Sequence, residues 1–526
     1  METQAALKSV QGVKWRRWGG AIAQFLLVAL IFGIAYTQDA IFHSPENQNT
    51  KYLIGLARGG YGLLQQDWMV GTLDPLPVFT ALVQVTYQFL HAEYAFYAYY
   101  FLIFGVYVYS LVGIVSQVYP LRNNRVRLGL FFALFLIVHC LHLEMFDGDF
   151  DLGWHLHAGV AQQYILGPVF QPANFGAFLL LSIERFLRGH TWVAVPLLAL
   201  AATFHPAYFP SVGVLTLAYM AVLAWRRHFK AALGVGMLST VLILPVLSYM
   251  LVTFQDTTPA LAAQAADIIV NQRIPHHSIP AEWLDIAAYI QVGVVAIALL
   301  LTRRHLLFPI LAIPYATAVF LTGLQMVINN DFVAFIAPWR ISVFLVPIAT
   351  SLILAWGVTA VTRRWPRWCD RHQIFLVRAS LVVILTTVIF GGLSQIEKWT
   401  MRDETVSMMT FVRDTKQPGE VYLIPPDVED LRKFRLFTGA PIFINRKTHP
   451  YKDVEVIEWN QRLERAKAFY EVRRPPQQCR LLKREFRKDG VTHVVLPQGL
   501  IRRRCPTLTE LYQDDHYGVY EISARR

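Results

Sequence analysis

The sequence predicts a mainly α-helical, polytopic membrane protein with about eleven transmembrane helices and a small C-terminal α/β domain. Of its 526 residues, 55% are hydrophobic and 16% are charged, whereas soluble proteins average about 25% charged residues. Long apolar runs recur up to residue 395 and then stop. Residues 396–526 have the mixed composition of a globular domain. We therefore expect a transmembrane domain over residues 1–395 and a soluble domain over residues 396–526.

The apolar runs define the predicted spans. A helix needs roughly 20 apolar residues to cross about 30 Å of hydrocarbon. The segments that qualify are residues 19–37, 95–119, 128–143, 170–187, 192–204, 208–225, 231–254, 286–302, 306–328, 341–361 and 374–395. Basic residues precede the first span, but no small-residue cleavage site follows it, so we expect it to be retained.

The distribution of basic residues predicts the orientation. The apolar stretch at residues 76–90 is short and interrupted by Gln84 and Gln88, so we interpret it as a helix lying on the membrane surface. If this stretch is not counted as a span, the loops on the N-terminal side of the membrane hold many arginines and lysines. The connecting loops on the opposite side hold only Lys51, Arg58, Arg273 and Arg340. The positive-inside rule then predicts a multi-pass protein of the plasma (inner) membrane with a cytoplasmic N-terminus and an exoplasmic, or periplasmic, C-terminal domain.

The cysteines fit this orientation. Cys479 and Cys505 both fall in the predicted exoplasmic domain, where an oxidising compartment permits a disulfide. Two free thiols are the alternative. Cys140 lies in a span, and Cys369 lies in a basic cytoplasmic loop.

Polar residues that are able to act in catalysis or in ligand binding gather in two predicted exoplasmic loops. The first loop, residues 38–94, is longer than a connector requires and carries Asp39, Glu46, Lys51, Arg58 and Asp67. We take Lys51, Arg58 and Asp67 as candidate substrate contacts, and Asp39 and Glu46 as further candidate site residues.

The second loop, residues 144–169, carries three carboxylates at alternate positions, Asp147, Asp149 and Asp151, followed by His155. Closely spaced acids either raise a proton affinity or bind a divalent cation, and oxygen ligands favour magnesium, manganese or calcium. The expected cofactor is therefore a divalent cation, magnesium or manganese, held by these three residues. Asp149 is also a catalytic candidate, and His155 is a candidate substrate contact. An acidic, solvated loop tip is the alternative.

Two further candidates lie at the mouths of spans. Arg340 precedes the tenth predicted span, and His205 precedes Pro206 in the turn between the fifth and sixth. A guanidinium matches phosphate oxygens in a two-pronged fashion, so Arg340 is a candidate clamp for a lipid phosphate. His205 adds an imidazole on the same side of the membrane and is a candidate substrate contact. Snorkelling to the interface or pairing with Asp331 is the alternative for Arg340.

Several functions are disfavoured. The basic residues sit in short tethers between apolar runs rather than in one patch, which argues against a nucleic-acid partner. The sequence lacks a phosphate-cradling glycine loop, a serine nucleophile elbow and a paired-cysteine motif, which argues against soluble nucleotide chemistry.

The C-terminal domain alternates short strands with helices. Strands are predicted at residues 421–424, 441–444, 491–496 and 518–522, and helices near 454–471 and 481–488. Three segments are candidates for lining a binding surface, namely residues 434–438, residues 445–451 and the group Glu458, Trp459 and Arg462. Packing into the core, or a solvated charged helix, is the favoured alternative.

Taken together, the acid just after the first span, the long first loop, the aspartate-rich second loop and the terminal α/β domain resemble the GT-C superfamily of membrane glycosyltransferases. The resemblance implies transfer of a sugar from a polyprenyl-phosphate-linked donor to a glycan, lipid or protein acceptor at the exoplasmic face. It implies a base or acceptor-orienting role for Asp39 or Glu46, metal or acceptor binding by Asp147, Asp149 and Asp151, and phosphate binding by Arg340, Lys51 and Arg58. Two other classes stay open, a transporter or flippase and a noncatalytic membrane assembly factor.

Overall fold

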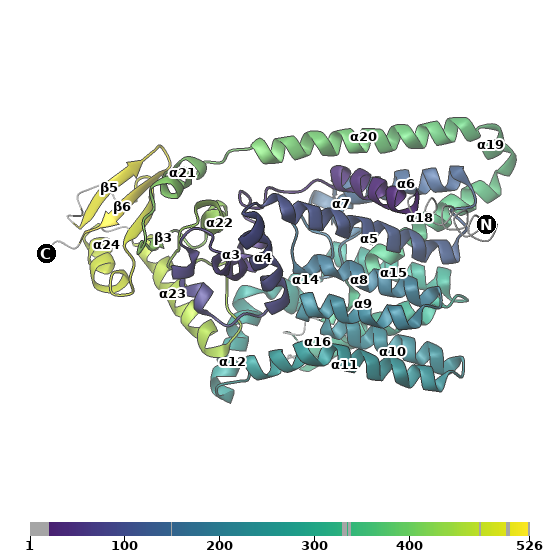
Figure 1. The fold of residues 1–526 in the computed structure, drawn as a ribbon, viewed down its shortest axis with the longest axis horizontal. Helices are drawn as coiled ribbons and strands as arrows, with labels where there is room; N and C mark the ends of the chain where they lie inside the picture. Colours follow the sequence, from purple (N-terminus) through teal and green to yellow (C-terminus); the bar gives the residue numbers. More distant parts are fainter. Residues whose placement is uncertain are drawn as a thin grey trace, which may run out of the picture.

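The protein is mainly helical and elongated, with a helical bundle at one end and the C-terminal domain at the other (Figure 1). A computed structural model describes residues 20–148, 150–328, 334, 338–472, 475–500, 505 and 507–523. We call the end of the bundle that meets the C-terminal domain the domain end.

Each predicted span contains a helix. These helices are the N-terminal helix Gly20–Tyr36, α5 Tyr94–Val118, α6 Arg125–Cys140, α8 Ala177–Leu187, α9 Thr191–Phe204, α10 Phe209–Trp225, α11 Phe229–Thr253, α15 Ile286–Thr302, α16 Leu307–Ile328, α18 Leu345–Arg364 and α20 Gln373–Thr400. Among the described residues, 6 helices are long and apolar enough to cross a membrane. They are α5, α10 with its preceding turn, α11, α16, α18 with its preceding turn, and α20. The chain is thus a multi-pass membrane protein.

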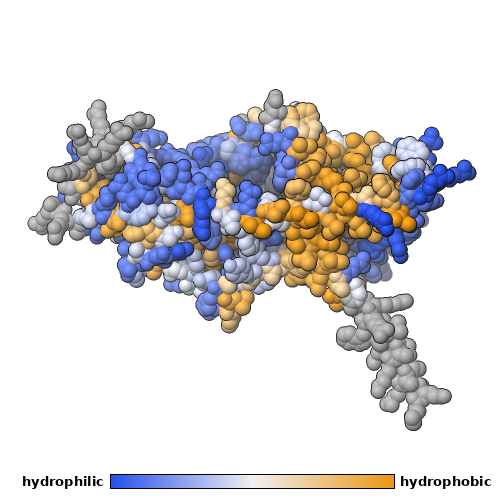
Figure 2. Space-filling model, turned by 90° about the horizontal axis from the view of Figure 1, so that it is seen from above, coloured by the Kyte–Doolittle hydropathy of each residue, from blue (hydrophilic) through white to orange (hydrophobic). Residues whose placement is uncertain are grey.

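The outer surface of the bundle is apolar. Seen from above, a continuous hydrophobic zone covers the helical part, with hydrophilic surface on both sides of it (Figure 2). Helices α11 and α20 expose large apolar side chains such as Leu251 and Phe390. Because such exposure in water opposes folding, these faces belong in lipid.

The stretch predicted to lie on the membrane surface forms α4, Pro77–Leu90, at the domain end of the bundle (Figure 1). A proline at its start supplies the backbone angle of a first helical turn. The helix packs closely on α3, Leu53–Arg58. A Cβ on Gly55 would lie 2.7 Å from the Cβ of Val83, so this close approach requires glycine.

Short helical turns make up most of the loops at the domain end. They are α2 Gln48–Lys51, η1 Leu64–Gln66, η2 Trp68–Gly71, α7 Leu152–His155, η4 Pro172–Gly176, η5 Pro206–Tyr208, α12 Pro259–Asp267, η6 Ile268–Arg273, α13 Pro275–Ser278, α14 Pro280–Trp283 and η7 Pro338–Ser342. The second loop also contains a small hairpin, β1 Glu144–Met145 with β2 Phe150–Asp151. Helix α19, Pro366–Arg371, lies at the other end of the bundle.

The C-terminal domain is built on a 4-stranded sheet of order β3-β4-β6-β5. Strand β3 pairs parallel to β4, and the other pairings are antiparallel. Its elements are α21 Val406–Thr415, β3 Tyr422–Leu423, η8 Asp430–Lys433, α22 Phe434–Thr438, α23 Asp453–Glu471, α24 Pro475–Leu481, η9 Leu482–Phe486, β4 His493–Pro497, β5 Leu508–Gln513 and β6 Tyr517–Ile522.

The structure corrects the predicted elements in three places. Residues 441–444 form no strand, and only a single bridge joins Ile442 to Tyr422. Strand β5 was missed because its side chains are mostly exposed and polar, so it lacks an apolar pattern. Helix α20 continues through the predicted boundary to Thr400, which delivers the chain to the C-terminal domain without a loop at residue 395.

Candidate functional site

Four basic side chains converge where the C-terminal domain meets the bundle. We call Lys51, Arg273, Arg340 and Lys447 the basic cluster. They come from α2, η6, η7 and the segment before α23, so four separate parts of the chain build it. All four are partly exposed and therefore accessible to a ligand.

Tyr451 and His449 stand at the centre of this cluster. The Lys51 Nζ donates to the Tyr451 hydroxyl at 3.3 Å. The Arg273 Nε lies 3.2 Å from the His449 Nδ1, and its Nη2 donates to the Lys447 carbonyl at 2.7 Å. The Arg340 guanidinium is near enough for its charge to act on the Tyr451 phenol.

The pKa values of these groups record the excess of positive charge. Burial acts to raise the pKa of Tyr451, but the charges of Lys51, Arg340 and Arg273 bring it below its usual value. Burial first, and then the charge of Arg273, lowers the pKa of Lys447 to about 8. Cations crowded in this way are stabilised by any anion that binds among them.

Among the described residues, carboxylates do little to neutralise Lys51, Arg273 and Lys447, whereas Asp331, the predicted alternative partner of Arg340, lies outside these residues. Within the described ranges, Lys51, Arg273 and Lys447 form no ion pair with a carboxylate. Among the acids whose charge acts on Lys447, Glu46 has the largest effect. The site is therefore suited to an anionic ligand such as a phosphate.

Glu46 and Asp39 lie beside the cluster. Glu46 stands just before Asn47, the N-cap of α2, and α2 ends in Lys51, so this short segment brings both side chains to the site. Burial raises the pKa of Glu46, Lys447 opposes this, and Asp39 adds to it. The Asp39 Oδ1 accepts from the Lys398 Nζ of α20 at 2.8 Å. Glu46 is thus the acid less committed to a partner.

His205 joins the same site. It ends α9 and starts η5 at the domain end. Burial, and then the charges of Lys51 and Arg340, lower the pKa of its imidazole well below the usual value. The structure thus brings together three predicted substrate-binding residues, Lys51, His205 and Arg340.

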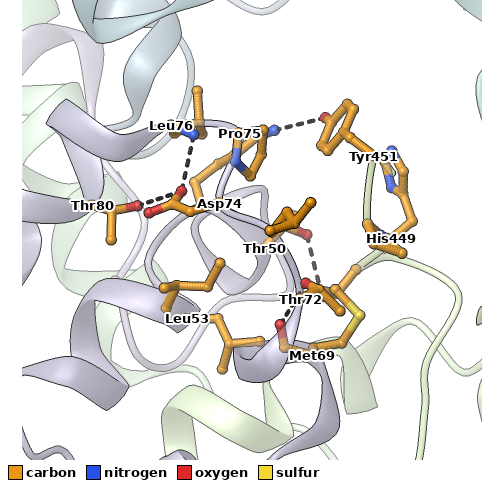
Figure 3. Close-up of a pocket in the computed structure, with 15 residues that line it drawn as sticks. Thr50, Leu53, Met69, Thr72, Asp74, Pro75, Leu76, Thr80, His449 and Tyr451 are labelled. Atoms are coloured by element: carbon orange, nitrogen blue, oxygen red, sulfur yellow. Dashed lines mark hydrogen bonds between the residues drawn. The ribbon is translucent and has the colours of Figure 1, made fainter. Parts of the chain in front are cut away.

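A narrow pocket opens next to Lys51, between the first loop and residues 448–451 (Figure 3). Threonines 50, 72, 80 and 448 line it together with Asp74, His449 and Tyr451. The cavity volume of about 30 Å³ has room for one or two water molecules rather than a sugar. Arg58 reaches its rim through an ion pair with Asp74, Nη1 to Oδ2 3.2 Å.

Asp67, predicted to contact substrate, instead contacts the C-terminal domain. Its carboxylate is buried and holds Arg435 of the C-terminal domain by two hydrogen bonds of 2.7 and 2.9 Å. It also accepts from the backbone N–H groups of Met69 and Ile442. Since its oxygens are occupied, we assign Asp67 to docking of the C-terminal domain rather than to substrate binding.

His155 and Asp151 belong to the second loop and pair with each other. The Asp151 N–H donates to the His155 Nδ1 at 2.8 Å, and the imidazole stacks on Phe150. The Asp151 carboxylate contacts the His142 Nδ1 at 2.6 Å and accepts from the N–H groups of Leu143 and Gly153. These bonds shape the hairpin and leave Asp151 poorly suited to bind a metal.

The other two predicted metal ligands are not placed. Asp149 lies outside the described residues, as does the side chain of Asp147. In the part of the chain that the structure describes, no group of 3 or more His, Cys, Asp or Glu side chains could hold a metal ion. The divalent-cation site of the second loop therefore stays a prediction.

The cysteines of the C-terminal domain are joined. Cys479 and Cys505 form a disulfide with an S–S distance of 2.07 Å. It ties α24 to the segment before β5.

Lys447, His449 and Tyr451 fall within residues 445–451, one part of the candidate binding surface of the C-terminal domain, but none of the three was assigned an individual role from sequence. The run Arg446-Lys-Thr-His-Pro-Tyr451 is basic and aromatic, which was the available signal. Arg273 was counted only as a residue of an exoplasmic loop. Nothing in sequence spacing shows that these residues meet Lys51 and Arg340.

Part of the C-terminal domain matches a known family. Residues 403–466 match a family described as a domain of unknown function, DUF6798. This match covers α21 through most of α23, and so includes Lys447, His449 and Tyr451. No curated protein matches the chain.

Proposed function

We propose that the protein is a membrane glycosyltransferase of GT-C type that transfers a sugar from a polyprenyl-phosphate-linked donor to an acceptor. The observation that carries the proposal is the basic cluster beside Glu46 at the end of a membrane bundle. A lipid donor could keep its tail in the bilayer while its phosphate lies among Lys51, Arg273, Arg340 and Lys447.

Glu46 is the proposed general base, with Asp39 as a second carboxylate that raises its proton affinity. The base removes the proton from an acceptor hydroxyl, whose oxygen then attacks the anomeric carbon. The bond between that carbon and the donor phosphate oxygen breaks, and the phosphate leaves with the bonding electron pair. The basic cluster stabilises the negative charge that grows on the phosphate.

The proposal includes the topology inferred from sequence: eleven spans, a cytoplasmic N-terminus, and the site with the C-terminal domain on the exoplasmic side of the plasma membrane. It is supported by the position of the basic cluster, since His205, Arg340 and Lys51 all lie at the domain end. Labelling of a cysteine introduced at the exposed Glu458 in intact cells tests the orientation. We expect the introduced cysteine to react with a membrane-impermeant maleimide in intact cells. A cysteine that reacts only after lysis would show that the orientation is the reverse of the proposed one.

The activity is tested with protein purified into nanodiscs and a radiolabelled polyprenyl-phosphate sugar. Wild-type protein should bind the donor, and Lys51→Met or Arg273→Met should weaken binding roughly tenfold or more, because a charge-assisted hydrogen bond is lost. Lys467→Met is the matched control, since Lys467 pairs with Glu464 on the surface of α23. Equal binding by all variants would exclude the basic cluster as the donor site.

Transfer is tested separately from binding. Glu46→Gln should retain donor binding but lose transfer of the label to an acceptor fraction from the same membranes, because the general base is absent. Donor binding with no transfer by the wild type would favour an assembly factor. Movement of the donor across a vesicle membrane, without transfer, would favour the flippase alternative.

A further inference from the structure

A second feature lies at the opposite end of the bundle, away from the basic cluster. An open groove runs between the N-terminal helix, α5, α8 and α9, with a cavity volume of about 370 Å³. Apolar side chains form most of it, and two polar ones complete it; the lining residues are Phe25, Val106, Tyr109, Leu181, Arg185, Val193 and Leu197.

On α5 and α8, the polar groups of the groove lie toward the far membrane surface and the apolar ones lie deeper. Helices α5 and α8 run away from the domain end, so Tyr109 and Arg185 each lie one turn closer to the far membrane surface than Val106 and Leu181. The Arg185 Nη2 donates to the Tyr109 hydroxyl at 2.6 Å. A polar rim above an apolar channel has the same polarity gradient as a phospholipid.

Charge at the rim is unbalanced. The carboxylate of Glu184 is fully buried and contacts Arg185 at 2.6 Å and Arg188 at still closer range. Two arginines against one carboxylate leave one positive charge in excess. Gly113 of α5 makes room for this arrangement, because a Cβ there would lie 2.5 Å from the Glu184 Cγ.

We propose that this groove binds a phospholipid with a net negative headgroup, with its phosphate on Arg185 and an acyl chain along Leu181 and Leu197. The Arg185 Nε contacts Glu184 and its Nη2 donates to Tyr109, so Nη1 is the group that would donate a charge-assisted hydrogen bond to the phosphate. Basic residues near a membrane surface also favour anionic lipids. The lipid would lie in the leaflet away from the C-terminal domain and is separate from any sugar donor.

The proposal is tested with delipidated full-length protein and lipids of identical acyl chains, phosphatidylglycerol and phosphatidylcholine. Native mass spectrometry should show one tightly bound phosphatidylglycerol molecule. The midpoint temperature of thermal unfolding should rise more with phosphatidylglycerol than with phosphatidylcholine. Arg185→Gln should weaken phosphatidylglycerol binding roughly fivefold. Arg226→Gln, at the end of α10 and not part of the groove, should leave it unchanged.

Leu197→Trp is the second variant, since it fills the groove and leaves Glu184, Arg185 and Arg188 in place. It should reduce retention of phosphatidylglycerol while the protein stays folded. Equal retention of the two lipids by the wild type would overturn the proposal. So would equal losses in Arg185→Gln and Arg226→Gln, which would indicate only diffuse surface charge.

Discussion

Arg435 and Asp67 form a buried, two-pronged ion pair that joins the C-terminal domain to the first loop. The Arg435 Nε lies 2.7 Å from the Asp67 Oδ2, and its Nη2 lies 2.9 Å from the Oδ1. The two side chains are 1% and 0% exposed. The same carboxylate accepts from Ile442 in the C-terminal domain and Met69 in the loop, so the two parts hold each other in position next to the basic cluster.

Asp67→Asn should destabilise the protein strongly. Removing one partner of a buried ion pair costs about 3–5 kcal/mol, because the other charge stays buried without compensation. Thermal unfolding and limited proteolysis of the purified protein measure the loss. Glu458→Gln breaks the half-exposed pair with Arg462 and should cost at most about 1 kcal/mol. Similar effects of the two variants would show that the Asp67 pair does not hold the domain.

Anion binding at the basic cluster should weaken as the pH rises through about 8. Lys447 has its pKa lowered to about 8, so it loses its charge over this range. Inorganic pyrophosphate, titrated by calorimetry between pH 7 and 9, provides the probe. Lys447→Arg should flatten the profile, because arginine stays protonated. If pyrophosphate binding by the wild type did not depend on pH, Lys447 would not take part in anion binding.

The stability of the unliganded protein should change in the opposite direction. Because the pKa of Lys447 is lower in the folded state than in the unfolded chain, the unfolded state binds this proton more tightly. This residue's contribution to stability therefore increases as the pH rises from about 8 toward the ordinary lysine value. Comparing wild type with Lys447→Met isolates this contribution from that of other titrating groups.

The loss of the proposed transferase activity at low pH, which is the acid limb of its pH profile, should follow the protonation of Glu46. A general base works only when deprotonated, and burial raises the pKa of Glu46 above its usual value. Since the charge of Lys447 lowers that pKa, Lys447→Met should move the acid limb to higher pH. The measurement is the pH dependence of kcat at saturating donor. An unmoved acid limb would point to another base.

Reduction should destabilise the C-terminal domain. The disulfide closes a loop with a sequence separation of 26 residues, for which chain-entropy estimates give about 3–4 kcal/mol. A Cys479→Ser/Cys505→Ser double variant should show this loss in thermal unfolding. Adding a reductant should then lower the midpoint of the wild type and leave the double variant unchanged. A reductant effect on both would point to a cause other than this bond.

Local patterns were enough to predict most helices. The apolar runs at residues 231–254 and 374–395 became α11 and α20, whose exposed side chains face lipid. The stretch at residues 76–90 is helical, as α4, and its predicted position on the membrane surface stays a prediction. Strand β5 was missed because a short, exposed strand at the edge of a sheet carries no apolar alternation.

Individual side-chain roles were predicted less well. Lys51, His205 and Arg340, each a candidate substrate contact, lie in one site, whereas Asp67 pairs with Arg435 and Arg58 pairs with Asp74. Acids and bases attract any opposite charge that the fold brings near. Residue type alone therefore cannot separate a substrate ligand from a docking contact.

Hydropathy and helix length are properties of contiguous residues, so the amino-acid order was enough to establish a multi-pass membrane protein with a globular C-terminal region. The convergence of Lys51, Arg273, Arg340 and Lys447 around Tyr451 and His449 became visible only in the folded chain. These residues are far apart in sequence, and their meeting depends on how the C-terminal domain docks on the bundle. Long-range packing sets that arrangement, and no local pattern encodes it.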